Sequence, residues 1–500
     1  MGLNDVRAAL RSAAPLVVVE APAGCGKTYE AIGCAVDLAA DLREGQEVLL
    51  LAHTNVAVGE FRRRARAAGA RVHATTLDGF ALGLVAPYAG ALALSSPLVP
   101  GDGPGETPFH LLAPKALELL RRAPSLAAVT RRHYPVVLLD EHQDTRQDQH
   151  ELALELGRAS ASRTRIFGDP MQAIYGFGGE ALVEWEGLAR DAEVKVELDD
   201  PQRWSEAPDL GSWILRARHA LRNGDRLPLV DAPDSVRLVR IPGLDDVPNP
   251  NSDRVPAAIM DPLRIRLRDL RGSVAVLGRN NAHVRGLFSA VRGSLVVQEG
   301  VDFHLADEAL AVAEGSVGNP QGLSRSVIDL LGATCRGLDA GIRRQLKTSL
   351  QADRLDRGHR QRIASLLDAL EPIYQTPDVA TWCLAIGRIL RAPPDWLKID
   401  LPASLRLLAR LRPIHEHTPR EALDVAVRQR HDAGAVPGRC ASTIHKAKGQ
   451  EFDHVIVAHC SASPFPESPE ARRLLYVALS RARLSITILA SGVAPSPLLP

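Results

Sequence analysis

A short segment near the N-terminus, EAPAGCGKTYE at residues 20–30, constrains the fold more than any other part of the chain. The apolar residues 16–19 before it predict a buried strand, and residues 28–42 after it predict a helix. Between them, the GxGKT pattern matches the core of a phosphate-binding loop, in which backbone N–H groups and the lysine hold phosphates and the threonine hydroxyl ligates Mg²⁺. The residues of this core are Gly24, Gly26, Lys27 and Thr28. Ala21 stands where the strict pattern has glycine, but a plain glycine-rich turn does not explain why lysine and threonine follow directly.

Two adjacent carboxylates, Asp140 and Glu141, end the apolar run of the segment VVLLDEHQDT at residues 136–145. Neighbouring carboxylates repel each other unless a cation lies close by. Lys27 and a magnesium ion supply that positive charge if the two segments meet at the carboxyl ends of parallel strands. We therefore expect Asp140 to hold Mg²⁺ through water and Glu141 to orient and deprotonate the attacking water.

Further segments follow in the order of the motifs of a known family. With them, the chain resembles the UvrD/Rep/PcrA-type superfamily 1 DNA helicases over most of its length. The longest of these segments are IFGDPMQAIYGFGG at 166–179, STIHKAKGQEFDHVIV at 442–457 and EARRLLYVALSRAR at 470–483. The others are LLLAHTNVAVGEF at 49–61, TTLDGFAL at 75–82 and VAVLGRNNAHVRGL at 274–287. The resemblance implies an α/β fold with two RecA-like parallel-sheet P-loop motor domains and two helical insertions, called 1B and 2B.

The resemblance also implies that ATP and Mg²⁺ lie between the two motor domains. Gln172 would couple the γ-phosphate to DNA, and Arg481 stands at the arginine-finger position. The catalytic residues implied in this way are Lys27, Asp140, Glu141, Gln172, Arg203 and Arg481. The implied nucleotide-binding residues are Ala21, Pro22, Ala23, Gly24, Cys25, Gly26, Lys27, Thr28, Arg203, Gly449, Glu451 and Arg481. The implied Mg²⁺ ligands are Thr28 and Asp140.

Single-stranded or tailed DNA is the partner that the resemblance implies. Its contact residues would be His53, Thr54, Asn55, Thr76, Tyr175, Phe177, Thr443 and His445. In this chain His53 replaces a phenylalanine, Phe177 replaces a tryptophan and Gly178 replaces an arginine. Because stacking contributes about 1–3 kcal/mol per base, these exchanges predict a weakened grip on DNA. The alternative for Phe177 is a core aromatic residue.

The residues that read adenine in the family are replaced here. Val6 or Arg7 stands in place of an N-terminal glutamine, and Gln202 replaces a tyrosine that stacks on the base. Arg203 keeps the arginine that touches the γ-phosphate, while the Trp204 side chain points elsewhere if the register holds. We therefore predict weak discrimination among nucleoside triphosphates.

The motif order divides the 500 residues into two motor domains, two insertions and a tail. Domain 1A is expected at residues 1–85 and 132–198, and domain 2A at residues 199–302 and 437–490. Insertion 1B is expected at 86–131, an all-helical insertion 2B at 303–436 and a loose tail at 491–500. Both insertions are shorter than those of the full-length repair helicases.

Composition limits the surroundings of the chain. A net charge of +1 argues against coating of nucleic acid by the whole surface but allows a local basic groove. The sequence has neither an apolar run long enough to span a bilayer nor the apolar core of a signal peptide at residues 1–14. Six cysteines without a CxxC pair argue against a disulfide framework or a zinc site and favour the cytoplasm.

Two functions remain open from the sequence. The first is an ATP-dependent helicase or translocase that moves 3′→5′ on single-stranded DNA, the direction being implied by the resemblance. The second is a DNA-sensing ATPase subunit with little unwinding of its own, resembling the helicase-like subunit of the Gabija anti-phage system. Such a subunit would act beside an OLD-family nuclease with a TOPRIM domain. A P-loop kinase does not explain the segments at 442–457 and 470–483.

Overall fold

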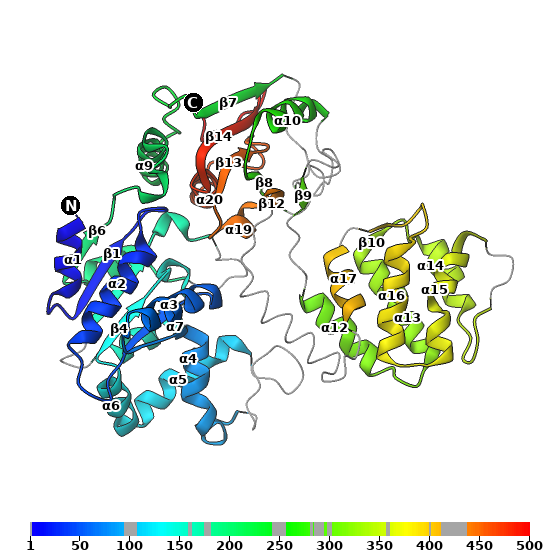
Figure 1. The fold of residues 1–500 in the computed structure, drawn as a ribbon, viewed down its shortest axis with the longest axis horizontal. Coiled ribbons are helices and arrows are strands. Elements are labelled where there is room, and N and C mark those ends of the chain that lie inside the picture. Colours follow the sequence, from blue (N-terminus) through cyan, green and yellow to red (C-terminus); the bar gives the residue numbers. More distant parts are fainter. Residues whose placement is uncertain are drawn as a thin grey trace. The chain divides into compact units, whose positions relative to one another are not determined.

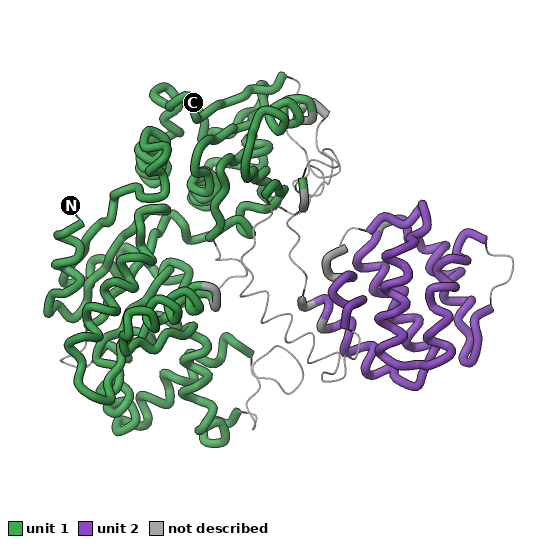
Figure 2. The backbone as a smooth tube through the Cα atoms, viewed as in Figure 1, with its two compact units in different colours: residues 1–298, 435–500 green, residues 299–434 purple. Residues whose placement is uncertain are grey.

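The computed structural model divides the chain into two compact units (Figure 2). Unit 1 contains residues 1–298 and 435–500, and unit 2 contains residues 299–434. The residues that the structure describes are 3–94, 108–158, 163–174, 182–242, 257–280, 284, 295–297, 303–356, 361–399, 402–411 and 438–500. Both six-stranded sheets, and with them the predicted nucleotide-binding segments, lie in unit 1.

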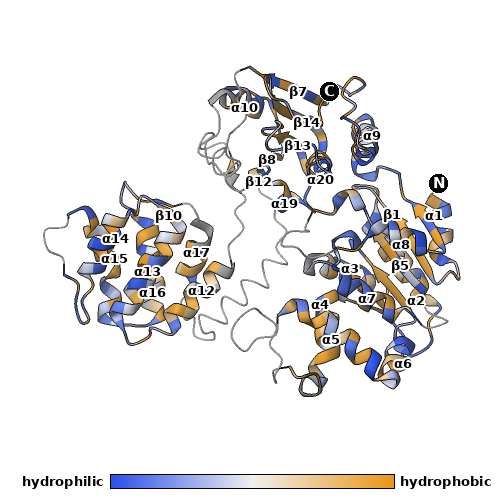
Figure 3. Cartoon of the chain, turned by 180° about the vertical axis from the view of Figure 1, so that it is seen from behind, coloured by the Kyte–Doolittle hydropathy of each residue, from blue (hydrophilic) through white to orange (hydrophobic). Residues whose placement is uncertain are grey.

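The first sheet of unit 1 has six parallel strands in the order β3-β2-β4-β5-β1-β6 (Figure 1). Its strands are β1 (Leu16–Glu20), β2 (Val48–Ala52), β3 (Val72–Thr76), β4 (Val136–Leu139), β5 (Arg163–Gly168) and β6 (Val194–Glu197). Consecutive residues of β1 alternate between the two faces, because Val17 and Val19 pack in one core and Val18 packs in the other. Both faces are therefore buried, as expected for strands that read as continuous apolar runs. In Figure 3 the strands of this sheet are coloured largely as hydrophobic.

Helices cover both faces of the first sheet. The face of Val17 packs against α1 (Leu3–Arg11), α2 (Lys27–Ala40) and α3 (Asn55–Ala67). The face of Val18 packs against α4 (Leu77–Val85), α5 (Phe109–Arg122), α6 (Pro124–His133), α7 (Gln147–Leu156) and α8 (Trp185–Asp191). The short 3-10 helices are η1 (Ala86–Tyr88), η2 (Gly90–Leu92), η3 (His142–Asp144), η4 (Pro170–Gln172), η5 (Gln202–Trp204) and η6 (Gln361–Ile363).

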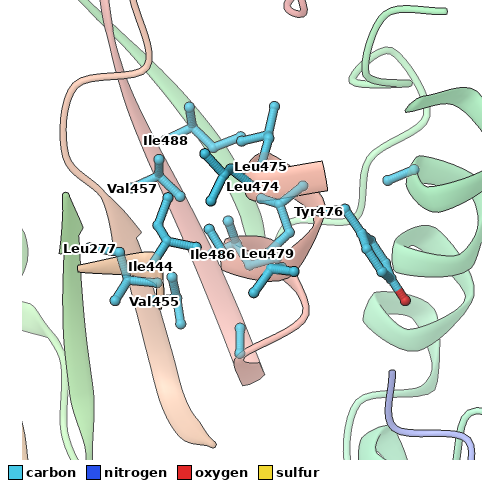
Figure 4. Close-up of a cluster of buried hydrophobic side chains, with 14 of the residues drawn as sticks. Leu277, Ile444, Val455, Val457, Leu474, Leu475, Tyr476, Leu479, Ile486 and Ile488 are labelled. Carbon is cyan, nitrogen blue, oxygen red and sulfur yellow. The ribbon is translucent and has the colours of Figure 1, made fainter. Parts of the chain in front are cut away.

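The second sheet of unit 1 also has six strands, in the order β7-β14-β13-β8-β12-β9, and all its pairs are parallel. Its strands are β7 (Val236–Ile241), β8 (Val274–Gly278), β9 (Val296–Val297), β12 (Arg439–Thr443), β13 (Phe452–Val457) and β14 (Ala482–Ser491). The helices α9 (Pro208–Asn223), α19 (Ile444–Ala447) and α20 (Pro469–Leu479) cover one face, and α10 (Ala257–Asp269) covers the other. Figure 4 shows the apolar side chains that join α20 to β13 and β14. Two parallel sheets with flanking helices confirm the predicted α/β fold with two RecA-like domains.

The expectation of a loose tail at residues 491–500 is wrong. Leu498 and Leu499 are 0% and 2% exposed and belong to the core beside α20. The backbone N–H of Leu227 donates to the carbonyl oxygen of Leu498 at 2.9 Å, and that of Ser496 donates to Cys460 at 3.2 Å. The two leucines are apolar side chains that fill space against the second sheet, so burial outweighs the loop-like composition around them.

The described part of unit 2 is mainly helical, but it also contains a two-residue ladder, β10 (Cys335–Arg336) with β11 (Lys398–Ile399), and an isolated bridge between Leu350 and Leu355, which the expectation of an all-helical insertion did not include. Its helices are α12 (Phe303–Glu314), α13 (Pro320–Thr334), α14 (Ala340–Ser349), α15 (Ala364–Gln375), α16 (Val379–Arg391) and α17 (Pro402–Arg410). Three of these helices have a capping side chain at the N-terminus. The side chains of Asn319, Asp339 and Asp378 accept hydrogen bonds from backbone N–H groups of α13, α14 and α16. Trp382 lies at the centre of a separate apolar core. Within the described part of the chain, no helix is both long and apolar enough to cross a membrane.

Candidate nucleotide-binding and nucleic-acid site

The loop after β1 has the backbone geometry of a phosphate cradle. Gly24 and Gly26 have φ angles of 74° and 78°, a region that side chains with a Cβ atom rarely adopt. A Cβ atom on Gly24 would lie 2.8 Å from Cβ of Arg203 and from the Trp204 ring. Helix α2 begins directly after the loop at Lys27, so its first backbone N–H groups and its positive dipole end face the loop. This combination fits the phosphates of a nucleotide.

The structure brings the predicted lysine and the acidic pair together. Nζ of Lys27 lies 2.6 Å from Oε1 of Glu141, and the Thr28 hydroxyl donates to Oδ2 of Asp140 at 3.4 Å. Burial raises the pKa of Asp140, and the Glu141 charge adds to this while Lys27 opposes it. For Glu141 burial acts upward, but the charges of Lys27 and Lys448 lower its pKa overall. The carboxylate of Glu141 is thus kept ionised beside the lysine.

Glu141 has a strained backbone. Its φ angle of 54° lies in the left-handed region, which is uncommon for residues other than glycine. Its backbone N–H donates to Oδ1 of Asp140 at 3.0 Å, and Nε2 of Gln143 donates to its carboxylate at 2.6 Å. Such strain persists only where surrounding contacts hold it, and it is typical of functional positions. Here it turns the carboxylate towards the phosphate-binding loop.

Gln172 and Arg481, predicted from separate motifs, are in contact. Nη2 of Arg481 donates to Oε1 of Gln172 at 3.2 Å, and Nε of Arg481 donates to the Val477 carbonyl at 3.0 Å. Arg481 is fully buried, and burial, with repulsion from Arg203, lowers its pKa to about 10. The Glu141 charge acts on it in the opposite direction. The guanidinium is thus close enough to Glu141 for the carboxylate charge to act on it.

Arg203 provides a second link between the two domains of unit 1, because it contacts both the phosphate-binding loop and Glu451. Nη2 of Arg203 lies 2.7 Å from Oε1 of Glu451, and Nη1 donates to the Ser480 carbonyl at 2.5 Å. The backbone N–H of Arg203 donates to the Gly24 carbonyl at 2.9 Å. Gly449 lies in the turn before Glu451, between α19 and β13. The arginine thus joins the phosphate-binding loop to the segment that precedes β13.

Lys448 is a site residue that the sequence analysis missed. Its Nζ atom donates to Oδ2 of Asp144 and to the Gln172 carbonyl, each at 2.5 Å. Burial lowers the pKa of Lys448, although Asp144 and Glu141 act to raise it. The sequence feature that could have indicated Lys448 is the second lysine of the segment HKAKG. Its carboxylate partner, Asp144, lies 304 positions away, so the spacing of residues does not reveal the pair.

The residues expected to read adenine have other contacts. Val6 is fully buried in the core of α1 and α2, and the Arg7 guanidinium binds the Glu30 carboxylate through two hydrogen bonds of 2.9 and 2.8 Å. The amide of Gln202 binds Asp200. Trp204 packs its ring against Gly24 and donates from its indole nitrogen to the Ala482 carbonyl at 2.7 Å, so its ring is buried in the core of the second sheet.

All three threonines predicted to bind DNA cap helices at the ends of strands. Thr54 follows β2, whereas Thr76 and Thr443 are the last residues of β3 and β12. Their hydroxyl oxygens accept hydrogen bonds from backbone N–H groups of α3, α4 and α19. Each cap uses the hydroxyl oxygen as acceptor, which leaves its proton for donation to a phosphate. The other residues predicted to contact DNA are His53, Asn55, Tyr175, Phe177 and His445.

Burial lowers the pKa of His445, and His53 is exposed directly after β2. Asn55 is the first residue of α3. Tyr175 and Phe177 lie outside the described residues, so both alternatives for Phe177 stay open.

The fold and the phosphate-binding loop with its neighbouring side chains define a P-loop protein with two RecA-like domains. Two family models match the chain: the UvrD/REP helicase N-terminal domain over residues 105–185 and the UvrD-like helicase C-terminal domain over residues 439–489. Both matches support a UvrD-like helicase family, and with it a DNA-dependent ATPase that uses ATP and Mg²⁺. No curated protein matches the chain.

Proposed function

We propose that this chain is an ATP-dependent DNA translocase of the UvrD type, which couples hydrolysis to 3′→5′ movement on single-stranded DNA. The contact between Arg481 and Gln172 carries this proposal, because it links the basic group of one domain to the loop after β5 of the other. Residues of both domains would then contact the same γ-phosphate. The six cysteines are all buried free thiols, which supports a cytoplasmic location.

The residues at the loop fit ATP and its magnesium ion. The loop backbone and the start of α2 would hold the phosphates, and Thr28 and Asp140 offer two oxygen atoms 3.4 Å apart to a hard cation. Magnesium supplies charge neutralisation on the phosphates when bound. Lys27 would exchange Glu141 for a phosphate oxygen, which frees the ionised Glu141 carboxylate to orient and deprotonate water.

Movement would follow from loss of the γ-phosphate. Arg481, Arg203 and Gln172 would contact it from opposite sides of the cleft, so its release removes attraction between the domains. The helix-capping threonines Thr54, after β2, and Thr443, at the end of β12, would bind the DNA backbone, one from each domain. Opening and closing of the cleft would then shift one grip relative to the other.

Strand displacement on a 3′-tailed duplex tests the proposal. We expect DNA-stimulated ATP hydrolysis, displacement from the 3′-tailed duplex and none from a 5′-tailed duplex. Lys27→Ala serves as the inactive control, since it removes the cation at the phosphates. Displacement from the 5′-tailed substrate alone would contradict the direction of movement.

Stimulated hydrolysis without displacement would favour the second candidate, a DNA-sensing subunit that activates a partner nuclease, as in a Gabija-like anti-phage complex. The exchanges at His53 and Phe177 favour it, because they predict a weak grip on bases. Co-elution of the purified chain with an OLD-family TOPRIM nuclease would support this role, and absence of co-elution would count against it.

A further inference from the structure

Tyr476 is a buried residue of α20 whose hydroxyl reaches loops of the first domain. Figure 4 shows its ring directed away from Leu474 and Leu475 and from the strands. The residue is 0% exposed. Its hydroxyl accepts the backbone N–H of Ala23, in the phosphate-binding loop, at 2.9 Å and donates to Oδ2 of Asp169 at 3.1 Å. One hydroxyl of the second domain therefore joins two loops of the first.

Asp169, the residue after β5, is the centre of this contact. Its buried carboxylate accepts Nη2 of Arg218 at 2.9 Å on Oδ1 and Nε2 of Gln172 at 2.9 Å on Oδ2. Arg218 also binds Glu20, at the end of β1, at 2.5 Å. Arg218 thus pairs with both carboxylates, and Arg222 adds a second positive charge at Glu20, so Asp169 is held by charge-assisted hydrogen bonds.

The carboxylate of Asp169 also decides which way the Gln172 amide faces. Because Nε2 of Gln172 donates to Asp169, Oε1 is the atom that faces Arg481. A reversed amide would place an N–H group against the guanidinium, which has no acceptor. The phosphate-binding loop and the Gln172–Arg481 contact are thus held by the same carboxylate.

We propose that Tyr476 and Asp169 are positioning residues that couple the shape of the phosphate-binding loop to the Gln172–Arg481 contact. This inference rests on the proposed ATPase function. Neither residue lies at the phosphates; each acts through Ala23 or Gln172. The coupling makes the affinity for nucleotide depend on how closely the two domains approach each other. The shape of the phosphate-binding loop and the Gln172–Arg481 contact therefore change together.

Tyr476→Phe tests the coupling, because it removes one hydroxyl and keeps the ring. The variant leaves the buried N–H of Ala23 without its acceptor and removes one donor from Asp169. We expect the KM for ATP, and the Kd for a fluorescent ATP analogue, to rise about 10-fold or more. Tyr374→Phe in unit 2 is the matched control, since it also removes one hydroxyl bond, to the Gln351 carbonyl at 3.0 Å. It should change neither constant.

A purely structural role gives a different result. Tyr476→Phe would then lower the melting temperature and the active fraction, and so kcat, while KM and Kd stay at the wild-type values; that outcome overturns the proposal. A double-mutant cycle with Gln172→Ala adds a second criterion. We expect the two losses in kcat/KM to be less than additive, whereas additive losses mean that Tyr476 does not act through Asp169 and Gln172.

The coupling and the proposed function fail in distinguishable ways. Wild-type hydrolysis with an unchanged Kd in Tyr476→Phe overturns the coupling alone. A wild-type chain that binds the analogue without hydrolysing ATP contradicts the ATPase function, while the Kd ratio still decides the coupling. A wild-type chain that does not bind the analogue overturns both.

Discussion

Lys27 and Glu141 form an ion pair, with Nζ and Oε1 2.6 Å apart, at the phosphate-binding loop. The Lys27 side chain is 8% exposed and the Glu141 side chain 33%, so the lysine is shielded from water while the carboxylate stays partly accessible. Burial acts to lower the pKa of Lys27, but the charges of Glu141 and Asp140 raise it overall. In the proposed mechanism, a phosphate that binds Lys27 would release the ionised Glu141 carboxylate to act as the base.

Glu141→Gln should separate binding from hydrolysis. The amide keeps the size of the side chain but loses the charge that holds Lys27, so ATP binding should be unchanged or tighter. Hydrolysis should fall about 100-fold or more because the base is lost. Filter binding of labelled ATP together with a single-turnover assay measures both. Lys27→Ala should lose binding and hydrolysis together, and equal losses in the two variants would argue against a role for Glu141 as base.

Gly24→Ala should damage the phosphate-binding loop. A methyl group there meets Arg203 and Trp204 at 2.8 Å and forces a left-handed φ on alanine, so we expect destabilisation of about 1–3 kcal/mol and loss of nucleotide binding. Gly33→Ala in α2 is the control, because a Cβ atom there meets nothing within 4 Å. Urea unfolding should show that the control is as stable as the wild type or more so. Normal nucleotide binding by Gly24→Ala would contradict this reading of the loop.

Arg481→Ala should slow turnover with little change in nucleotide affinity. The guanidinium contacts Gln172 and no part of the phosphate-binding loop, so its attraction is used mainly when charge develops on the γ-phosphate. We expect kcat to fall about 1000-fold, as for arginine fingers in general. Arg483→Ala removes a more exposed arginine two residues away and should leave kcat unchanged. A parallel loss of binding in Arg481→Ala would mean that this residue is not the finger.

The ratio of ATP to GTP hydrolysis tests the prediction about the base. Arg7 is bound to Glu30 and Trp204 is turned into the core, so neither offers a free contact to an adenine ring. Comparable kcat/KM values for the two nucleotides are expected. Strict dependence on ATP would refute the prediction and point to a base contact outside the residues discussed.

The buried pair of His142 and His150 predicts a loss of stability in acid. Nε2 of His142 lies 2.9 Å from Nδ1 of His150, and burial lowers the pKa of both imidazoles. The unfolded chain therefore binds more protons than the folded one near and below pH of about 6.5, so this stability is present above that pH and is lost as the pH falls.

His150→Gln should flatten the dependence of the unfolding free energy on pH between about pH 8 and about pH 5.5. His219→Gln, an exposed residue of α9, is the control and should leave the slope as in the wild type. Equal slopes in both variants would assign the acid sensitivity to other groups.

The sequence alone predicted the architecture of unit 1 because its strands are short apolar runs that end in motifs. The run before Asp140 and the run before the phosphate-binding loop could only be buried strands, and parallel strands bring their carboxyl ends to one edge. It failed at residues 491–500, where two leucines among prolines and small residues gave no periodicity to read. Burial there depends on a space between α20 and neighbouring segments that only the packed domain provides.

The local pattern of residues predicted Lys27, Thr28, Asp140 and Glu141 as the side chains that carry the chemistry, and the resemblance to the helicase family added Gln172 and Arg481 to the prediction. Tertiary structure alone decided their partners. Lys448 meets Asp144, and Tyr476 meets Ala23, across 304 and 453 positions of the chain. Periodicity and spacing describe neighbours along a strand or helix, whereas these contacts arise when two separately folded sheets pack together, and no local pattern records that packing.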